Sequence, residues 1–135
     1  MANQKGGVAK TTTAITLAAA LADTGHAVLV IDLDAQACAT FSLGIDPEDL
    51  LPRTVDFLLD DLPSGEGAAQ MRSAIRTTDE GFSLFPATLS LASADVSLAD
   101  RPARERTLSR ILDEIRDTFD VIVIDCSPSL GLTTI

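Results

Sequence analysis

The sequence predicts an α/β fold in which a parallel sheet is flanked by helices. Two short apolar runs, AVLVI at 27–31 and VIVI at 121–124, each lead into an aspartate. Runs of this length, rich in β-branched residues, are typical of strands buried on both faces of a parallel sheet. A helical pattern precedes each run, and this alternation favours parallel strands whose carboxyl ends meet at one edge. We therefore expect chemistry at that edge.

Composition sets further bounds on the fold and on the function. The chain has 135 residues, 46 % of them apolar, which favours one folded domain over disorder. Its net charge of −10 argues against binding nucleic acid through the overall field. Cys38 and Cys126 form neither a disulfide framework nor a zinc-type spacing, so we expect two buried thiols. Since no apolar run is long enough to span a membrane, we expect a cytoplasmic protein.

The first half of the chain begins with a loop at Asn3–Lys10. A helix is predicted from Thr11 to about Thr24, rich in Ala and Leu, with Gly25 as its C′ residue. The first strand follows, and residues 35–52 are expected to be mostly loop.

The second half begins with a short helix predicted at 54–61, followed by a turn region and a second helix at 68–76. A short strand is predicted at 82–88, stopped by Pro86. The clearest helix is expected at 103–118, because apolar residues there recur at helical spacing. These residues are Leu108, Ile111, Leu112, Ile115 and Phe119.

The stretch NQKGGVAKTTT, residues 3–13, has the properties of a phosphate-binding loop. Small residues let backbone N–H groups approach an oxyanion, and the following helix directs its positive end at it. Such a loop also needs a lysine for the phosphates and a hydroxyl for Mg²⁺. We expect phosphate binding by Gly6, Gly7, Val8, Ala9, Lys10, Thr11 and Thr12, with Thr11 as the metal ligand.

The loop departs from the general pattern G-x-x-x-x-G-K-[ST]. Ala9 precedes the lysine, and Gln4 stands where the first glycine is expected. Lys5 and Lys10 are the only lysines in the chain, so Lys5 requires an explanation of its own. A glycine-rich turn before an alanine-rich helix is the alternative reading of the loop alone.

Three aspartates reduce the weight of that alternative. Asp32 and Asp34 close the first predicted strand, and Asp125 closes the last. Nucleotide hydrolysis needs carboxylates near Mg²⁺ and a group that orients the attacking water. The carboxyl edge of a parallel sheet would present all three aspartates together.

Three segments carry a specific resemblance to a known family. KGGVAKTT resembles the deviant Walker A box of the ParA/MinD class of P-loop ATPases. IDLDAQACATFSLG resembles their switch I segment, and VIVIDCSPSLGLTT resembles their Walker B and switch II segment. The resemblance covers essentially the whole chain and favours chromosome- and plasmid-partitioning ParA/Soj proteins over MinD. It implies a P-loop NTPase fold and the cofactors ATP and Mg²⁺.

The resemblance also implies a role for each residue of the site. Lys10 would bind the phosphates in its own subunit, and Lys5 would reach the phosphates of a partner in an ATP-bound homodimer. Asp34 would position the attacking water. Asp32 would support the metal shell, and Asp125 would hold Mg²⁺ through water. The partners implied are a ParB-type centromere-binding protein and, in the family, non-specific DNA, whose binding region we expect to be absent from residues 1–135. The family also associates with the nucleoid, and no membrane partner is implied.

The sequence departs from the family pattern in several places, and these departures leave alternative functions open. Ala35, Ala37, Cys38 and Ser127 replace residues usual in the two switch segments, which we expect to alter loop stiffness more than chemistry. The family normally has a strand before residue 3 and a C-terminal half that binds adenine and DNA. We therefore expect residues 1–135 to form a partial ParA-type domain. A catalytically silent remnant and a MinD-like cell-division-site ATPase are the alternatives.

Overall fold

A four-stranded sheet forms the centre of the computed structural model, which describes residues 9–47, 67–91 and 107–127. The strands are β1 (Val28–Leu33), β2 (Arg76–Thr77), β3 (Ser83–Phe85) and β4 (Val121–Cys126). Their order across the sheet is β2-β3-β1-β4. Strand β1 pairs in parallel with both β3 and β4, whereas the short β2 pairs antiparallel with β3. The predicted α/β fold is confirmed, with one antiparallel strand at the edge.

Strand β1 is the most buried element because it has a parallel strand on each side. All six of its residues are buried, as expected for a continuous apolar run in a covered parallel sheet. Its register with β4 runs from the pair Val28 and Val121 to the pair Leu33 and Cys126. The two longest strands therefore begin together and end together, so their last residues share one edge.

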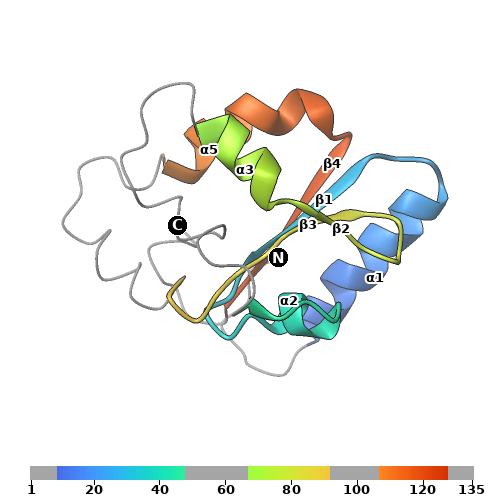
Figure 1. The fold of residues 1–135 in the computed structure, drawn as a ribbon. Coiled ribbons are helices and arrows are strands. Elements are labelled where there is room, and N and C mark those ends of the chain that lie inside the picture. The colour runs from blue at the N-terminus through green and yellow to red at the C-terminus, as the bar shows by residue number, and fades with distance from the viewer. Residues whose placement is uncertain (1–8, 48–66, 92–106, 128–135) are drawn as a thin grey trace.

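Helices cover both faces of the sheet (Figure 1). Helices α1 (Lys10–Asp23) and α2 (Cys38–Ser42) lie on one side, whereas α3 (Gly67–Ala74) and α5 (Thr107–Ile115) lie on the other. On the α1 side, Ala14 and Ala18 pack into a core with Val28, Val30 and Val123. The opposite core contains Leu29, Ile31, Phe85, Ala74 and Ile115. Alternate residues of β1 thus supply the two cores.

Helix α1 ends as the sequence predicts. Gly25 has φ +92, and its N–H donates to the Ala22 carbonyl. The N–H of His26 donates to the Leu21 carbonyl, which completes a Schellman motif. The chain then turns into β1. Asp120, which precedes β4, is hydrogen-bonded to Ala27, which precedes β1. Its carboxylate accepts the Ala27 N–H at 2.8 Å, and its own N–H donates to the Ala27 carbonyl at 2.8 Å.

Several predicted boundaries are wrong. The region expected to be loop after β1 contains α2, whose five residues are too few to show helical periodicity. Helix α3 ends at Ala74, and Arg76 belongs to β2, an element too short to be predicted. The last turn expected in the helix 103–118 is the 3₁₀ segment Arg116–Thr118.

Other predictions are confirmed or lie outside the description. The strand expected at 82–88 is confirmed in Ser83–Phe85, and the last strand extends to Cys126. The helix predicted at 54–61 and the start of the one predicted at 103 lie outside the described residues. Among the helices that the structure describes, none has the length and apolar character needed to cross a bilayer.

Candidate phosphate and magnesium site

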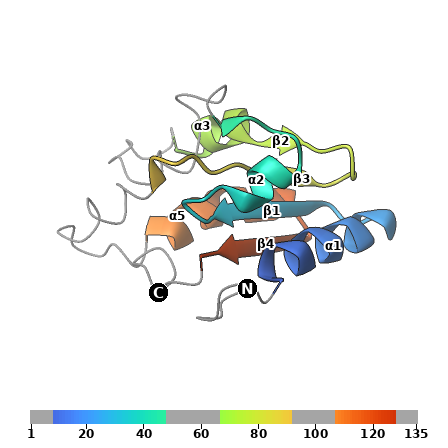
Figure 2. The same cartoon turned by 90° about the horizontal axis from the view of Figure 1, so that it is seen from below.

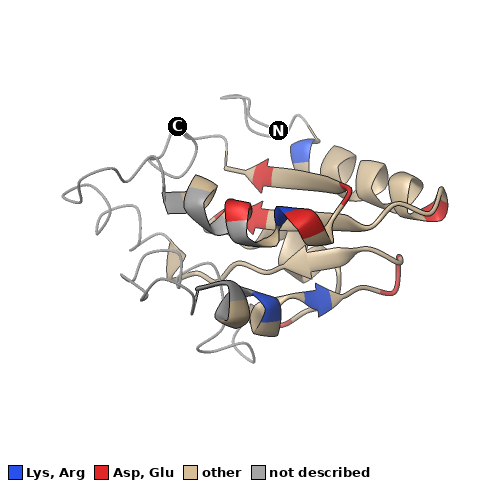
Figure 3. Ribbon diagram, turned by 90° about the horizontal axis from the view of Figure 1, so that it is seen from above, with Lys and Arg blue, Asp and Glu red and all other residues tan. Residues whose placement is uncertain are grey.

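Two buried aspartates lie side by side where the central strands end. Asp32 on β1 and Asp125 on β4 are partners in the parallel register. Their exposed fractions are 0 % and 1 %. Helix α1, which begins at Lys10, packs against both strands, and its N-terminal end lies close to this edge (Figures 2 and 3). The predicted clustering of Lys10, Thr11 and the strand-end carboxylates is therefore what the described residues show.

Asp125 is the unusual member of this group. Both of its carboxylate oxygens are buried without a hydrogen-bond partner among the described residues. Burial raises the pKa of Asp125 above the ordinary value, and the nearby Asp34 raises it further. The Thr11 hydroxyl, which faces this carboxylate but lies outside the geometry of a close hydrogen bond, and the Lys10 charge both favour the charged form of Asp125 and lower its pKa. A buried carboxylate in this position needs donors or a cation to offset its desolvation.

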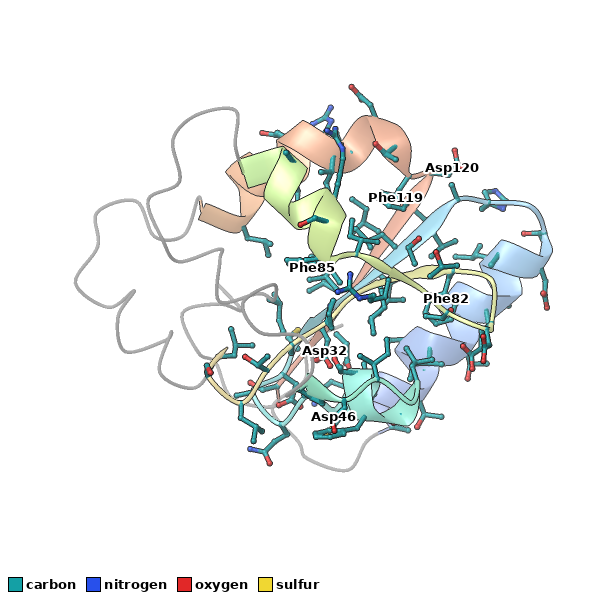
Figure 4. All side chains as sticks on the ribbon, in the orientation of Figure 1. Asp32, Asp46, Phe82, Phe85, Phe119 and Asp120 are labelled. Carbon is teal, nitrogen blue, oxygen red and sulfur yellow. The ribbon has the colours of Figure 1, made fainter. Side chains whose placement is uncertain are left out.

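Asp32, labelled in Figure 4, is buried as deeply as Asp125, but both of its carboxylate oxygens accept hydrogen bonds. Its Oδ2 accepts the Thr40 N–H at 2.9 Å and the Thr40 hydroxyl at 2.7 Å. Its Oδ1 accepts the Asp34 N–H at 3.0 Å. Burial raises the pKa of Asp32 to about 6 despite these three bonds, with a further contribution from Asp125. The two neighbouring carboxylates therefore have different environments: hydrogen-bond donors hold both oxygens of Asp32, whereas neither oxygen of Asp125 has a close donor among the described residues.

Asp34 begins the loop between β1 and α2, where it is half-buried. Its Oδ1 accepts the Gln36 N–H at 2.9 Å, and its carbonyl accepts the Ala37 N–H at 2.7 Å. These bonds fold the loop into a tight turn that keeps the Asp34 side chain near Asp125.

Two alanines in the left-handed region precede the two helices of this site. Ala9 has φ 57 and ψ 31 before α1, and Ala37 has φ 50 and ψ 38 before α2. They are the non-glycine residues with positive φ among the described residues. A Cβ in this region costs roughly 1–2 kcal/mol. Ala37 thus adopts the left-handed conformation at an energetic cost.

The remaining predicted site residues divide into two groups. Thr12 lies on α1 and is exposed, and Lys10 and Thr11 are half-buried. Lys5, Gly6, Gly7 and Val8 lie outside the described residues, so their expected roles stay predictions.

The two cysteines differ from each other. Cys126 is buried, as expected, but Cys38 is exposed because it opens α2 beside the loop. The prediction of two buried thiols is wrong for Cys38. Burial of its sulfur and then Asp34, Asp32 and Asp125 raise the Cys38 pKa. A thiol held protonated by carboxylates is a poor nucleophile.

Thr40 is the site residue that sequence reasoning missed. It lies within the segment that resembles switch I, yet a threonine in a five-residue helix has no motif of its own. Its exposed fraction is 0 %, and its hydroxyl accepts the Ala87 N–H at 3.1 Å while donating to Asp32. Only the folded arrangement brings these segments together.

The residues present fit a magnesium ion whose remaining ligands would be phosphate oxygens and water. Within the described part of the chain, no cluster of three or more His, Cys, Asp or Glu side chains could hold a metal alone. Mg²⁺ commonly binds one or two protein oxygens together with water and substrate phosphates. The orphaned Asp125 carboxylate and the Thr11 hydroxyl supply hard oxygen donors of this kind. Lys10, at the start of α1, supplies a positive charge for the phosphates.

Comparisons with known proteins identify a family model and relatives that match this chain. A family model described as an AAA domain matches residues 1–135. The sporulation initiation inhibitor protein Soj of Bacillus subtilis is 44 % identical, with 98 % of this chain matched to 50 % of that protein. The chromosome-partitioning ATPase Soj of Treponema pallidum is 42 % identical over 98 % of this chain and 49 % of its own length. The chain thus spans about half the length of the curated relatives that it matches.

A solved structure extends the comparison to three dimensions. The chain superposes on cobyrinic acid a,c-diamide synthase from Mycobacterium smegmatis, solved with ADP and magnesium, with a TM-score of 0.86 and 48 % identity. The match covers 97 % of this chain and 51 % of that one. The same protein has also been solved with an ATP analogue and magnesium. The sheet and helices described above therefore follow a nucleotide-binding fold.

Proposed function

Because this chain belongs to the ParA/Soj-type ATPases of the AAA-domain family, we propose that it binds ATP with Mg²⁺ and hydrolyses the γ-phosphate. The observation that carries the proposal is the buried Asp125 carboxylate, which has no hydrogen-bond partner among the described residues and lies near Thr11 and Lys10. A buried acid of this kind is costly without a cation. Asp125 lies near the end of β4, beside the first turn of α1, and a helix N-terminus favours phosphate.

We propose the following division of roles within the described residues. Lys10 binds the terminal phosphates, and the α1 N-terminus adds its partial positive charge. Thr11 and Asp125 would hold Mg²⁺, which would neutralise negative charge on the phosphates. Asp34 accepts a hydrogen bond from the attacking water and orients it toward the γ-phosphate. Ala9 and Thr12 flank the phosphates at the start of the helix.

The roles proposed for the preceding loop rest on the family resemblance. Gly6, Gly7 and Val8 would surround the phosphates with backbone N–H groups. Lys5 would reach the phosphates bound by a second subunit, so that ATP binding and dimerisation are coupled. We propose that residues 1–135 act as the nucleotide-binding part of such an ATPase.

A role in chromosome or plasmid partitioning is the biological setting that we propose. It is supported by the chromosome-partitioning name of the Treponema pallidum relative. In that setting a ParB-type protein stimulates hydrolysis, and the ATP-bound dimer associates with DNA. The name of the mycobacterial structure denotes a synthase instead. Turnover of ATP without any added co-substrate is expected for an ATPase and not for a synthase.

The direct test is the steady-state release of phosphate from ATP with Mg²⁺ or with EDTA. We expect Mg²⁺-dependent turnover in the wild type and its loss in Lys10→Ala. Asp120→Asn is the matched control, because Asp120 lies at the opposite end of the sheet from Asp32 (Figure 4). Equal rates in wild type and Lys10→Ala would refute hydrolysis at this site. Binding of ATP without turnover would identify the catalytically silent alternative.

A further inference from the structure

A buried junction joins three segments that are distant in sequence. The end of β1 contributes the Asp32 carboxylate, α2 contributes Thr40, and the segment after β3 contributes the Ala87 N–H. All three residues have an exposed fraction of 0 %. Water therefore cannot replace any of these hydrogen bonds without a change in packing.

The direction of each hydrogen bond in the junction is fixed. A backbone N–H can only donate, so the Thr40 oxygen accepts from Ala87 at 3.1 Å. The Thr40 hydroxyl proton is then directed at Asp32 Oδ2, 2.7 Å away. Thr40 uses its hydroxyl once as acceptor and once as donor, and no apolar residue of the same shape can do either.

The same carboxylate also holds the residue proposed to orient water. Asp32 Oδ1 accepts the Asp34 N–H at 3.0 Å, while Oδ2 is held by Thr40. Rotation of the Asp32 carboxylate would therefore displace the backbone of Asp34. The Asp34 side chain is tied to the same loop through the Gln36 N–H. Its position depends on Thr40 through one intermediate side chain.

We propose that Thr40 is a positioning residue for ATP hydrolysis, acting through Asp32 to fix Asp34 relative to the bound phosphates. This assignment rests on the proposed function. Thr40 is buried in the protein and takes no part in binding the nucleotide. Its loss should therefore lower kcat while leaving the KM for ATP nearly unchanged, because a misplaced water-orienting group weakens only the transition state.

The test compares three variants of the full chain in the presence of Mg²⁺ and ATP. Thr40→Val keeps the shape and removes the hydroxyl, and we expect kcat to fall about tenfold or more with KM changed less than about threefold. Thr40→Ser keeps the hydroxyl and should restore kcat to within about threefold of wild type. If Thr40→Val does not fold, Thr40→Cys offers a weaker donor in its place, and its kcat should lie below that of Thr40→Ser.

Thr78→Val is the matched control for the loss of a buried hydroxyl. The Thr78 hydroxyl donates to the Phe82 carbonyl at 2.9 Å. This bond lies in the turn between β2 and β3, away from the carboxyl ends of β1 and β4. This variant should lose thermal stability to a similar extent and keep kcat. Equal kcat in wild type and Thr40→Val, or an equal loss in Thr78→Val, would overturn the positioning role alone. Absence of Mg²⁺-dependent turnover in the wild type would refute the proposed function and, with it, this assignment.

Discussion

Asp32 and Asp125 are register partners on adjacent parallel strands, yet one carboxylate receives three hydrogen bonds and the other receives none from the described residues. The first is committed to holding its own loop. In the proposed site, the lone pairs of the second carboxylate would hold Mg²⁺. This division separates two roles within one pair of buried acids, and it is the basis of the first two predictions.

Replacing Asp125 by Asn should raise the stability of the free protein and weaken its stabilisation by Mg²⁺ and ATP. Burial raises the Asp125 pKa, so its charged form is disfavoured in the fold, and we expect a higher free energy of unfolding for Asp125→Asn in EDTA. With Mg²⁺ and ATP the wild type should gain thermal stability by ligand binding, whereas the variant should gain much less. Urea denaturation and thermal melts measure the two effects. A variant that is both less stable in EDTA and equally stabilised by Mg²⁺ and ATP would contradict this role.

Stability should rise as the pH falls from 7 to 5, in part because of Asp32. Its pKa is raised from 3.8 to about 6, so between these values the folded state holds a proton that the unfolded state releases. The free energy of unfolding therefore falls as pH rises through this window, by about 3 kcal/mol in total and about 1 kcal/mol between pH 5 and 7.

The measurement is urea denaturation of wild type and Asp32→Asn at pH 5 and pH 7 in EDTA. The general repulsion of an acidic chain is nearly the same in both proteins, so their difference isolates Asp32. The variant should lack about 1 kcal/mol of the stabilisation that the wild type gains at pH 5. Identical changes in the two proteins would show that Asp32 keeps an ordinary pKa.

The sequence predicts the main strands and the first helix of this fold because their patterns depend on neighbouring residues. The apolar runs of β1 and β4, the alanine-rich α1 and the Gly25 cap each depend on a few consecutive residues. Helix α2 and strand β2 are too short to show a period, and tertiary contacts form them. The strand order and the pairing of Asp32 with Asp125 follow from packing across the sheet.

The residues of the candidate site also divide into those that the sequence predicts and those that only the folded structure reveals. Lys10, Thr11 and the strand-end aspartates could be predicted because phosphate binding restricts residue types at fixed spacing. Thr40 could not, because its role depends on Ala87, which lies far along the chain. The left-handed conformation of Ala9 and Ala37 was equally hidden, since alanine gives no signal for positive φ.

Glycine substitutions at the two left-handed alanines should differ in a defined way. Ala9 is exposed, so Ala9→Gly relieves strain without losing buried surface, and we expect stability equal to or above wild type. The Ala37 methyl is buried in the core, so Ala37→Gly should be about 0.8 kcal/mol less stable than Ala9→Gly. Exposed Ala20 in α1 is the control, and Ala20→Gly should cost about 1 kcal/mol. Equal losses at Ala9 and Ala20 would contradict the strain at Ala9.

Cys38 should react slowly with alkylating reagents although it is exposed. Burial of its sulfur and the nearby Asp34, Asp32 and Asp125 raise its pKa, so little thiolate is present near neutral pH. We expect iodoacetamide to modify Cys38 in a Cys126→Ser background more slowly than it modifies free N-acetylcysteine. Removing one charge in Asp34→Asn should increase the rate.

The rate of this alkylation also reports the charge of the candidate site. A cation bound near Asp125 would offset the carboxylates that raise the Cys38 pKa, so Mg²⁺ with ATP should speed the reaction unless the nucleotide covers the thiol. Mass spectrometry of the modified chain at several pH values separates these cases, because a lowered pKa shifts the pH profile and steric cover lowers the rate at every pH. A Cys38 that reacts faster than N-acetylcysteine at pH 7 would contradict the raised pKa.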